Sequence, residues 1–103
     1  MKAAQAAGLA LALALPLAVR GDELGRKVFM QLAQPSCAIC HTLEAAGAAG
    51  TLGPSLDELK PDKERVLHVV RFGSGVMPPF RDKLSEQEIE AVAAYVAKAV
   101  GGR

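Results

Sequence analysis

Apolar residues recur every four positions shortly after residue 20. Leu24, Val28 and Leu32 form this series and predict a helix over residues 22–33. Acidic residues at its beginning suit the positive end of the helix dipole, and a proline at position 35 ends it. Gly25 is unusual inside a helix, where it costs about 1 kcal/mol relative to alanine. We therefore expect another element to approach the helix closely at this glycine.

Two further helices are predicted in the second half of the chain. Residues 61–72 begin with a proline, continue with acidic residues and stop before Gly73, which is the usual order of helix signals. Residues 85–100 carry a stripe of apolar side chains that ends at two glycines. Ser85 and Glu88 have the spacing of a capping box, which marks the beginning of this helix.

Glycine and proline interrupt the chain between these helices. Residues 42–55 and 73–80 hold several of them and predict irregular backbone. No segment alternates between apolar and polar positions in the manner of a strand. The pattern therefore predicts an all-α fold, and a length of 103 residues allows one domain.

Composition narrows the range of functions. The chain has 12 basic and 11 acidic residues, so it lacks the basic excess of a nucleic-acid-binding protein. Half of its residues are hydrophobic, which excludes a disordered tail. Aromatic residues make up only 4% and tryptophan is absent, so the core is short of large side chains. We expect a bound group to complete it.

The beginning of the chain predicts a secretory signal. Lys2 supplies a positive charge, and residues 6–19 form an apolar stretch of 14 residues that ends in small side chains. This stretch falls short of the roughly 20 residues that span a bilayer as a helix. We therefore expect residues 1–21 to be cleaved, leaving residues 22–103 as one soluble domain in the periplasm. A retained segment would instead act as a membrane anchor.

The candidate chemistry is concentrated in the run Cys37-Ala38-Ile39-Cys40-His41. Two thiols three positions apart share one face of a helical turn, so both sulfurs can reach the vinyl groups at one edge of a porphyrin. The histidine that follows can present its imidazole to the iron. This spacing is the attachment signature of c-type haem. It predicts one haem c, bound covalently through Cys37 and Cys40, with His41 as an iron ligand.

Three other interpretations of these cysteines compete. A thioredoxin-like dithiol would follow a strand, and no strand is predicted before Cys37. A zinc site needs four ligands, and only His68 remains in the chain once the motif is used. A structural disulfide between Cys37 and Cys40 would leave His41 unexplained. Haem attachment accounts for all three motif residues and is favoured.

The second axial ligand of the iron is expected from the segment after residue 73. Met77 precedes two prolines, which lack amide donors and fix φ, so its thioether is carried on a stiff loop. Thioether ligation raises the reduction potential relative to two imidazoles. His68 is the rival ligand, although its neighbours on the helix supply the buried face. Ordinary apolar packing by Met77 is the other alternative.

With these motifs the chain resembles a class I c-type cytochrome, a small electron carrier with a single haem. The resemblance extends over residues 22–103 and rests on the attachment motif and the loop of Met77. Residues 52–56 also resemble the family's loop whose proline carbonyl accepts the N–H of the haem histidine. The resemblance implies that Pro54 orients His41 in this way.

The resemblance also implies a fold, in which three main helices wrap around one covalently attached haem. Gly25 and Phe29 resemble the pair on the first helix that packs across the last helix, with Val92 and Tyr95 as their partners. This packing would account for the glycine within the first helix. The apolar wall of the haem cavity is expected to comprise Leu32, Ile39, Leu52, Leu56, Leu59, Val66, Val69, Val70 and Val96.

We expect electron transfer between exported redox proteins and no enzymatic reaction, because two strong axial ligands leave no coordination site for a substrate. A haem edge near Ala38, Ile39, Val76 and Pro78 is the expected docking surface for a transient donor and acceptor, such as a periplasmic dehydrogenase or a terminal oxidase. No nucleic acid is expected as a partner, and no membrane span after signal cleavage.

The basic residues beside the ligand loop have two interpretations. Arg71, Arg81 and Lys83 could steer an acidic partner, or they could be solvated surface charges. Three other functions also stay open: a haem subunit of a larger complex such as a periplasmic molybdenum dehydrogenase, a haem enzyme, and a ligand sensor with a displaceable sixth ligand. An enzyme would need a distal acid–base group, for which only His68 is available.

Overall fold

The computed structural model describes residues 21–101. The expected signal covers residues 1–21, so it lies outside the described residues except for Gly21. The first helix is α2 (Gly21–Lys27), with acidic residues in its first turn. It continues into a π-helical turn, η2 (Val28–Leu32), that ends where the amide of Ala33 donates to the carbonyl of Val28. The predicted single helix is therefore α-helical only in its first half.

The attachment motif begins on a single helical turn, α3 (Cys37–Cys40). The segment after it is more regular than the sequence predicts. Strands β1 (Thr42–Leu43) and β2 (Ala48–Ala49) pair in antiparallel fashion around a 3₁₀ turn, η3 (Glu44–Ala46). The expectation that the chain has no strand was wrong here. Two-residue strands are too short to show an alternating pattern.

Three helices follow, and side chains cap each of them. The short helix α4 (Leu56–Leu59) lies in a region where no helix was predicted. Helix α5 (Lys63–Phe72) begins after Asp62, two residues later than expected, because the Asp62 carboxylate accepts from the amide of Arg65. Helix α6 (Glu86–Ala99) begins with the predicted capping box, in which Ser85 and Glu88 bond to each other's backbone amides.

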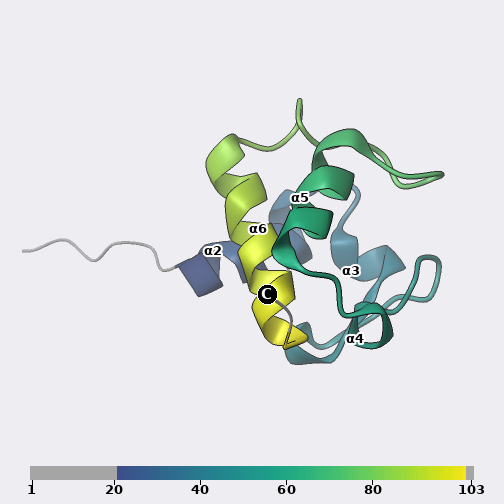
Figure 1. The fold of residues 1–103 in the computed structure, drawn as a ribbon. Coiled ribbons are helices and arrows are strands. Elements are labelled where there is room, and N and C mark those ends of the chain that lie inside the picture. Colours follow the sequence, from purple (N-terminus) through teal and green to yellow (C-terminus); the bar gives the residue numbers. More distant parts are fainter. Residues whose placement is uncertain (1–20, 102–103) are drawn as a thin grey trace, which may run out of the picture.

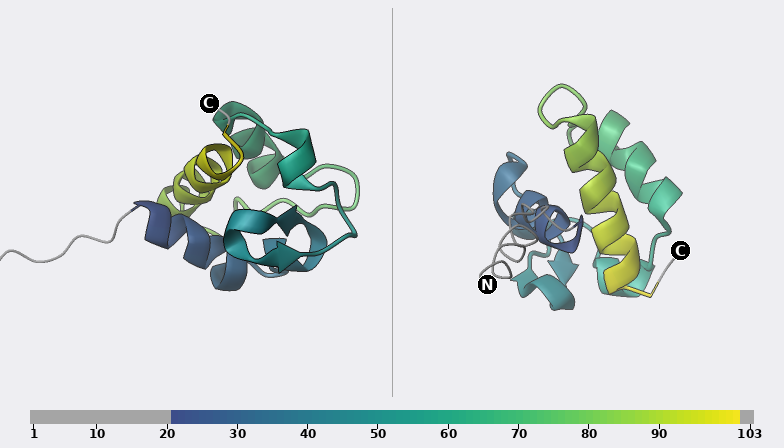
Figure 2. Two further views of the ribbon diagram at one scale, coloured as in Figure 1. Left: turned by 90° about the horizontal axis from the view of Figure 1, so that it is seen from below. Right: turned by 90° about the vertical axis from the view of Figure 1, so that its left-hand side faces the viewer.

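Helix α6 is the element on which the other long helices pack. Helix α5 runs beside it in the opposite direction (Figure 1), and α2 lies against another side of it (Figure 2). Gly25 of α2 is buried at the contact with α6, where an added Cβ would overlap the Cβ of Tyr95 and lie 2.5 Å from the carbonyl oxygen of Ala91. The rings of Phe29 and Tyr95 also meet, with centroids 6.3 Å apart. The predicted packing of the first helix on the last is confirmed.

The hydrophobic core gathers around these contacts. Its largest fully buried side chains are Phe29, Leu43, Ile89, Val28 and Val92. They come from η2, β1 and α6, so the short β-hairpin adds to the same core as the long helices. Within residues 21–101, no helix is long and apolar enough to cross a membrane.

Candidate functional site

A cavity of about 490 Å³ lies between α3, α4, α5 and the loop that leads to α6. Ligand sites in proteins typically measure about 300–1,000 Å³, so this cavity can hold a bound group. Most of its lining side chains are apolar. They include seven of the nine predicted wall residues, which are Leu52, Leu56, Leu59, Val66, Val69, Val70 and Val96.

Two predicted wall residues do not line this cavity. Ile39 is 59% exposed, because it lies between the two cysteines of α3 and therefore on the opposite side of that single turn. Leu32 packs against the core cluster instead. Phe29 and Val92 also line the cavity. From the sequence, both were expected at the contact between the first and last helices.

Helix α3 is attached to the rest of the protein through Ser36. The hydroxyl of Ser36 accepts from the amide of Ala38 at 3.2 Å and donates to the carbonyl of Phe29 at 3.1 Å. These bonds hold the helical turn against η2. Cys37 and Cys40, at its two ends, share a face and both line the cavity.

The two cysteines form no disulfide with each other. Burial raises the pKa of the Cys37 thiol to about 11, with a smaller rise from Cys40 and an opposing backbone hydrogen bond. Before haem is attached, the Cys37 thiol is therefore protonated at neutral pH. Two thiols held on one side of a turn, at the wall of an apolar cavity, are placed to bond to two neighbouring substituents of one flat molecule.

His41 comes directly after α3, where the backbone becomes extended. Its Nδ1 lies 2.7 Å from the carbonyl oxygen of Pro54. Because a carbonyl only accepts, Nδ1 is the nitrogen that carries the proton, and Nε2 of the neutral ring keeps its lone pair. The imidazole lines the cavity and is therefore prepared to act as a metal ligand through Nε2.

Gly53 makes the approach of this ring possible. A Cβ at Gly53 would lie 2.8 Å from Cε1 of His41, closer than side chains pack. The amide of Gly53 donates to the carbonyl of Cys40 at 2.7 Å. The loop before Pro54 is thus fixed to the end of α3 while its backbone lies against the histidine.

Met77 lines the cavity from the loop between α5 and α6. Its amide donates to the carbonyl of Ser74 at 2.9 Å, and the amide of Ser74 donates back to Met77 at 3.0 Å. Past the two prolines, Phe80 is buried and its amide donates to the carbonyl of Val70 at 2.8 Å. The methionine therefore lies on a closed turn that is attached to α5.

The rival ligand His68 lies elsewhere. It is exposed on α5, where its ring packs against Phe72 with centroids 5.1 Å apart, and it does not line the cavity. Among residues 21–101, no three His, Cys, Asp or Glu side chains gather in a metal-binding group. This arrangement disfavours the zinc site and an acid–base role for His68 at the cavity.

The three basic residues beside the ligand loop are partly engaged. Arg71 forms an ion pair with Glu86 at 2.8 Å, which raises the pKa of the guanidinium and lowers the pKa of the carboxyl. The guanidinium of Arg81 lies 5.5 Å from the centre of the Phe72 ring. Lys83 lies over a ring in the same way, at 5.6 Å from the centre of Phe80. Arg71 therefore ties α5 to α6, and it is not a free charge for steering a partner.

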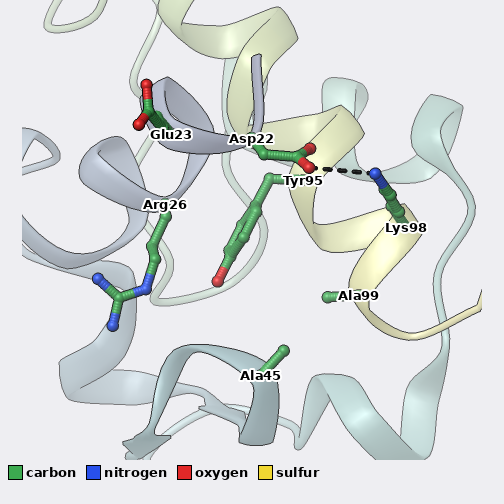
Figure 3. Close-up of a pocket in the computed structure, with 7 residues that line it drawn as sticks. All are labelled: Asp22, Glu23, Arg26, Ala45, Tyr95, Lys98 and Ala99. Carbon is green, nitrogen blue, oxygen red and sulfur yellow. Dashed lines mark hydrogen bonds and ion pairs between the residues drawn. The ribbon is translucent and has the colours of Figure 1, made fainter. Parts of the chain in front are cut away.

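A second hollow lies on the surface between α2, η3 and α6, with a volume of about 440 Å³ (Figure 3). It is lined largely by charged side chains, and the ammonium of Lys98 lies 3.1 Å from the carboxylate of Asp22. The Tyr95 side chain also reaches into it. None of the predicted haem-binding residues lies there, so the candidate site is the apolar cavity.

The residues around the apolar cavity fit a covalently bound haem. The cavity offers an apolar wall, two thiols on one face of a turn, a histidine with its Nε2 unprotonated and a thioether. The comparison with known proteins agrees. Residues 22–96 match the family described as "Cytochrome C oxidase, cbb3-type, subunit III". The chain belongs to the class I c-type cytochromes.

Individual relatives support the assignment of this cytochrome. It is 36% identical to cytochrome c6 of Bryopsis maxima over 89 residues, which cover 76% of the chain and 92% of the relative. It is also 36% identical to the chloroplastic cytochrome c6 of Chlamydomonas reinhardtii over 85 residues, or 73% of the chain and 52% of the relative. The crystal structure of the c-type cytochrome SorU from Sinorhizobium meliloti is similar with a TM-score of 0.75 and 50% identity, and the match covers 80% of this chain and 93% of that one.

These relationships confirm several of the predictions. The cytochrome has the class I fold, and it carries one covalent haem c at its two cysteines. It is a haem protein of the electron-carrier type. Several residues that line the cavity were not predicted from the sequence, and one of them is charged. Arg65, in the first turn of α5, lines the same cavity.

Proposed function

We propose that this cytochrome is a periplasmic one-electron carrier whose haem iron is bound by His41 and Met77. The observation that supports this most is that both side chains line the cavity that also contains the two thiols. When bound, the haem supplies an iron that alternates between the ferric and ferrous states.

The protein's own residues have distinct tasks in this proposal. The Pro54 carbonyl holds the proton of His41 on Nδ1, which directs Nε2 to the iron and increases its basicity. The thioether of Met77 would be the second protein ligand of the iron, and it would favour the ferrous state relative to a second imidazole. With both ligands bound, no substrate would reach the iron, so we propose no enzymatic activity.

Partners would meet the protein beside the cavity. Val76, next to Met77, is 99% exposed, and Ile39 and Leu52 are also largely exposed. A small apolar surface of this kind suits brief contact with an exported electron donor and acceptor, such as a dehydrogenase or a terminal oxidase. The apolar segment at residues 6–19 supports export, and the mass of the mature protein tests the cleavage.

Substitution of Met77 by alanine tests the proposed ligation. We expect Met77→Ala to keep its covalent haem but to lose the sulfur-to-iron charge-transfer band of the oxidised protein. Its reduction potential should fall, and its reduced form should bind carbon monoxide, which the unaltered protein should resist. Visible spectra and a redox titration measure all three effects.

Met30→Ala is the matched control, because Met30 packs against the core and does not line the cavity. This variant should keep the spectrum and the potential of the unaltered protein. Met77→His should remain closed to carbon monoxide and should also have a lower potential, since imidazole stabilises ferric iron better than a thioether does. An unchanged spectrum and potential in Met77→Ala would show that Met77 only packs.

A second candidate function is that of a haem subunit in a larger assembly. The side chains of Ile39, Leu52, Leu59, Phe72 and Val76 are large, apolar and exposed, and a permanent partner could cover them. The native mass of the protein purified from its source distinguishes the two functions. A free carrier elutes as a monomer, whereas a subunit elutes with its partner.

A further inference from the structure

The side chain of Lys83 bridges two segments at the edge of the haem cavity. Its ammonium donates to the backbone carbonyl of Gln34 at 3.4 Å, although the two residues are 49 positions apart in the sequence. Gln34 lies in the segment of residues 33–40, which carries the attachment turn, and Lys83 lies in residues 73–84, which carry Met77. In the described part of the chain, no other hydrogen bond joins these two segments.

The bridge crosses the wall of the cavity. Residues 35–37 line the cavity on the side of Gln34, and residues 76–78 and Phe80 line it on the side of Lys83. The first side holds a thiol that bonds to the haem, and the second side holds the thioether that we propose as an iron ligand. The bond from Lys83 therefore fixes the position of the thioether side relative to the attachment side.

The ammonium of Lys83 also lies over an aromatic ring on the thioether side. Its Nζ is 5.6 Å from the centre of the Phe80 ring, a distance at which a cation is attracted by the face of a ring. Phe80 is buried, and only two prolines separate it from Met77. Because proline fixes φ, a movement of Met77 away from the cavity is transmitted to Phe80.

The backbone holds Lys83 in place for both contacts. Its amide donates to the carbonyl of Phe80 at 2.9 Å, and the amide of Leu84 donates to the same carbonyl while the leucine side chain is buried. Gln34 is fixed as well, since the residue before it is fully buried and the residue after it lines the cavity. Both ends of the bridge are preorganised, so little backbone freedom is lost when it forms.

We propose that Lys83 is a positioning residue, which holds the segment of Met77 closed against the segment that carries the attachment turn. The buried ring of Phe80 attaches the turn of Met77 to the protein, and the Lys83 contacts strengthen this attachment. Without them, the part of the chain that opens locally extends past residue 79, and local opening becomes more frequent. The proposal rests on the proposed function, because it requires Met77 as the iron ligand that is positioned.

The test is amide hydrogen exchange in the oxidised holoprotein, measured by NMR. The amides of Ser74 and Met77 donate to each other's carbonyls, so their exchange reports how often the turn opens. Lys83→Met keeps most of the apolar stem and removes the ammonium. We expect both amides to exchange about 2–5-fold faster in this variant, which is the effect of losing one exposed cation–ring contact.

Two matched variants control for the substitution itself. Lys83→Arg keeps a cation and a donor, and it should restore the exchange rates of the unaltered protein. Lys27→Met makes the same chemical change at an exposed site on α2 that does not line the cavity, and it should also leave the rates unchanged. The amide of Ile89 in α6 should exchange equally slowly in all four proteins. Faster exchange at Ile89 in Lys83→Met would show general destabilisation and would contradict a local role.

The visible spectrum separates this proposal from the assignment of the iron ligands. If the unaltered oxidised protein has the sulfur-to-iron charge-transfer band but Lys83→Met shows unchanged exchange, only the role of Lys83 is overturned. If the unaltered protein lacks the band, ligation by Met77 is overturned, and the positioning role falls with it. Faster exchange at Ser74 and Met77, with the band present in the unaltered protein, supports both.

Discussion

The orientation of His41 depends on two neighbouring residues of one loop. The Pro54 carbonyl accepts from its Nδ1, and the missing side chain of Gly53 leaves space for the ring. Proline fixes φ at Pro54, so the carbonyl is presented from a backbone with few alternative shapes. The loop therefore sets the direction of the ring with its main chain alone.

Gly53→Ala is predicted to disturb this arrangement. The added Cβ would lie 2.8 Å from Cε1 of His41 and 3.1 Å from Nδ1, so either the ring or the loop must move. We expect a loss of about 1–3 kcal/mol in the free energy of unfolding, the usual cost of overpacking. Haem should stay attached, with an altered spectrum and potential. Thr51→Ala, at an exposed site on the same loop, should change neither the stability nor the spectrum.

Sequence alone predicted individual residues well where a motif constrains them. The Pro54 carbonyl was expected to meet His41, and the structure places the two in contact. Prediction failed for Ile39, since position within a motif does not say which side of a single turn is buried. Arg65 was missed because a charged residue in the first turn of a helix ordinarily faces solvent. Its place at the cavity depends on how α5 is rotated, which only packing decides.

Among the elements, α2 and α6 approach each other closely at Gly25. The Cα of Gly25 lies against the main chain of Ala91 and the Cβ of Tyr95, and neither can move without shifting α6. The same contact brings Phe29 against Tyr95. The first and last helices are far apart in sequence, so this contact brings the two ends of the described chain together.

Gly25→Ala is predicted to destabilise the protein despite the better helix propensity of alanine. Propensity alone would stabilise α2 by about 1 kcal/mol. The added methyl group would overlap Tyr95 and lie 2.5 Å from the Ala91 oxygen, and overpacking costs about 1–3 kcal/mol. Denaturant unfolding of the holoprotein should therefore show a net loss. Lys27→Ala, at an exposed site on the same helix, should show none. Equal stability of the two variants would contradict the close contact.

Long elements were predicted and short ones were missed, for a physical reason. Helices α5 and α6 have apolar stripes and caps that can be recognised locally. Helix α4 and strands β1 and β2 have four residues or fewer, too short for any period to appear. They exist because the surrounding structure positions them. The carboxylate of Asp57, for example, accepts from the amide of Glu44, which joins α4 to the beginning of η3 at 2.9 Å.

For the whole molecule, the haem completes the core. At ~24 cal/mol per Å³, an empty apolar cavity of about 490 Å³ would cost up to ~12 kcal/mol. Small domains have a total free energy of unfolding of about 5–15 kcal/mol. An open cavity partly collapses, so the real cost is smaller, but it is of the same order as the stability itself. Few aromatic side chains are available to fill the space.

The chain without haem is therefore predicted not to fold cooperatively. In the double variant Cys37→Ser and Cys40→Ser, covalent attachment is impossible. We expect reduced helical circular dichroism and a broad thermal transition, whereas the unaltered protein unfolds sharply. Mass spectrometry after acid–acetone extraction checks the chemistry, since the unaltered chain should keep one haem and the variant none. A sharp transition in the haem-free variant would show that the protein core suffices.

The turn that carries Met77 is fixed to the rest of the protein at both ends. Before it, α5 ends at Phe72, and after it the amide of Phe80 donates to the carbonyl of Val70 while its ring is buried. Residues 73–79 between these points are mostly exposed and add little to the core. Release of the thioether can therefore occur as a local opening, with every long helix still in place. The lifetime of the closed iron centre is then governed by these few residues, and a small molecule that competes for the iron would measure it directly, at temperatures far below those that melt the protein.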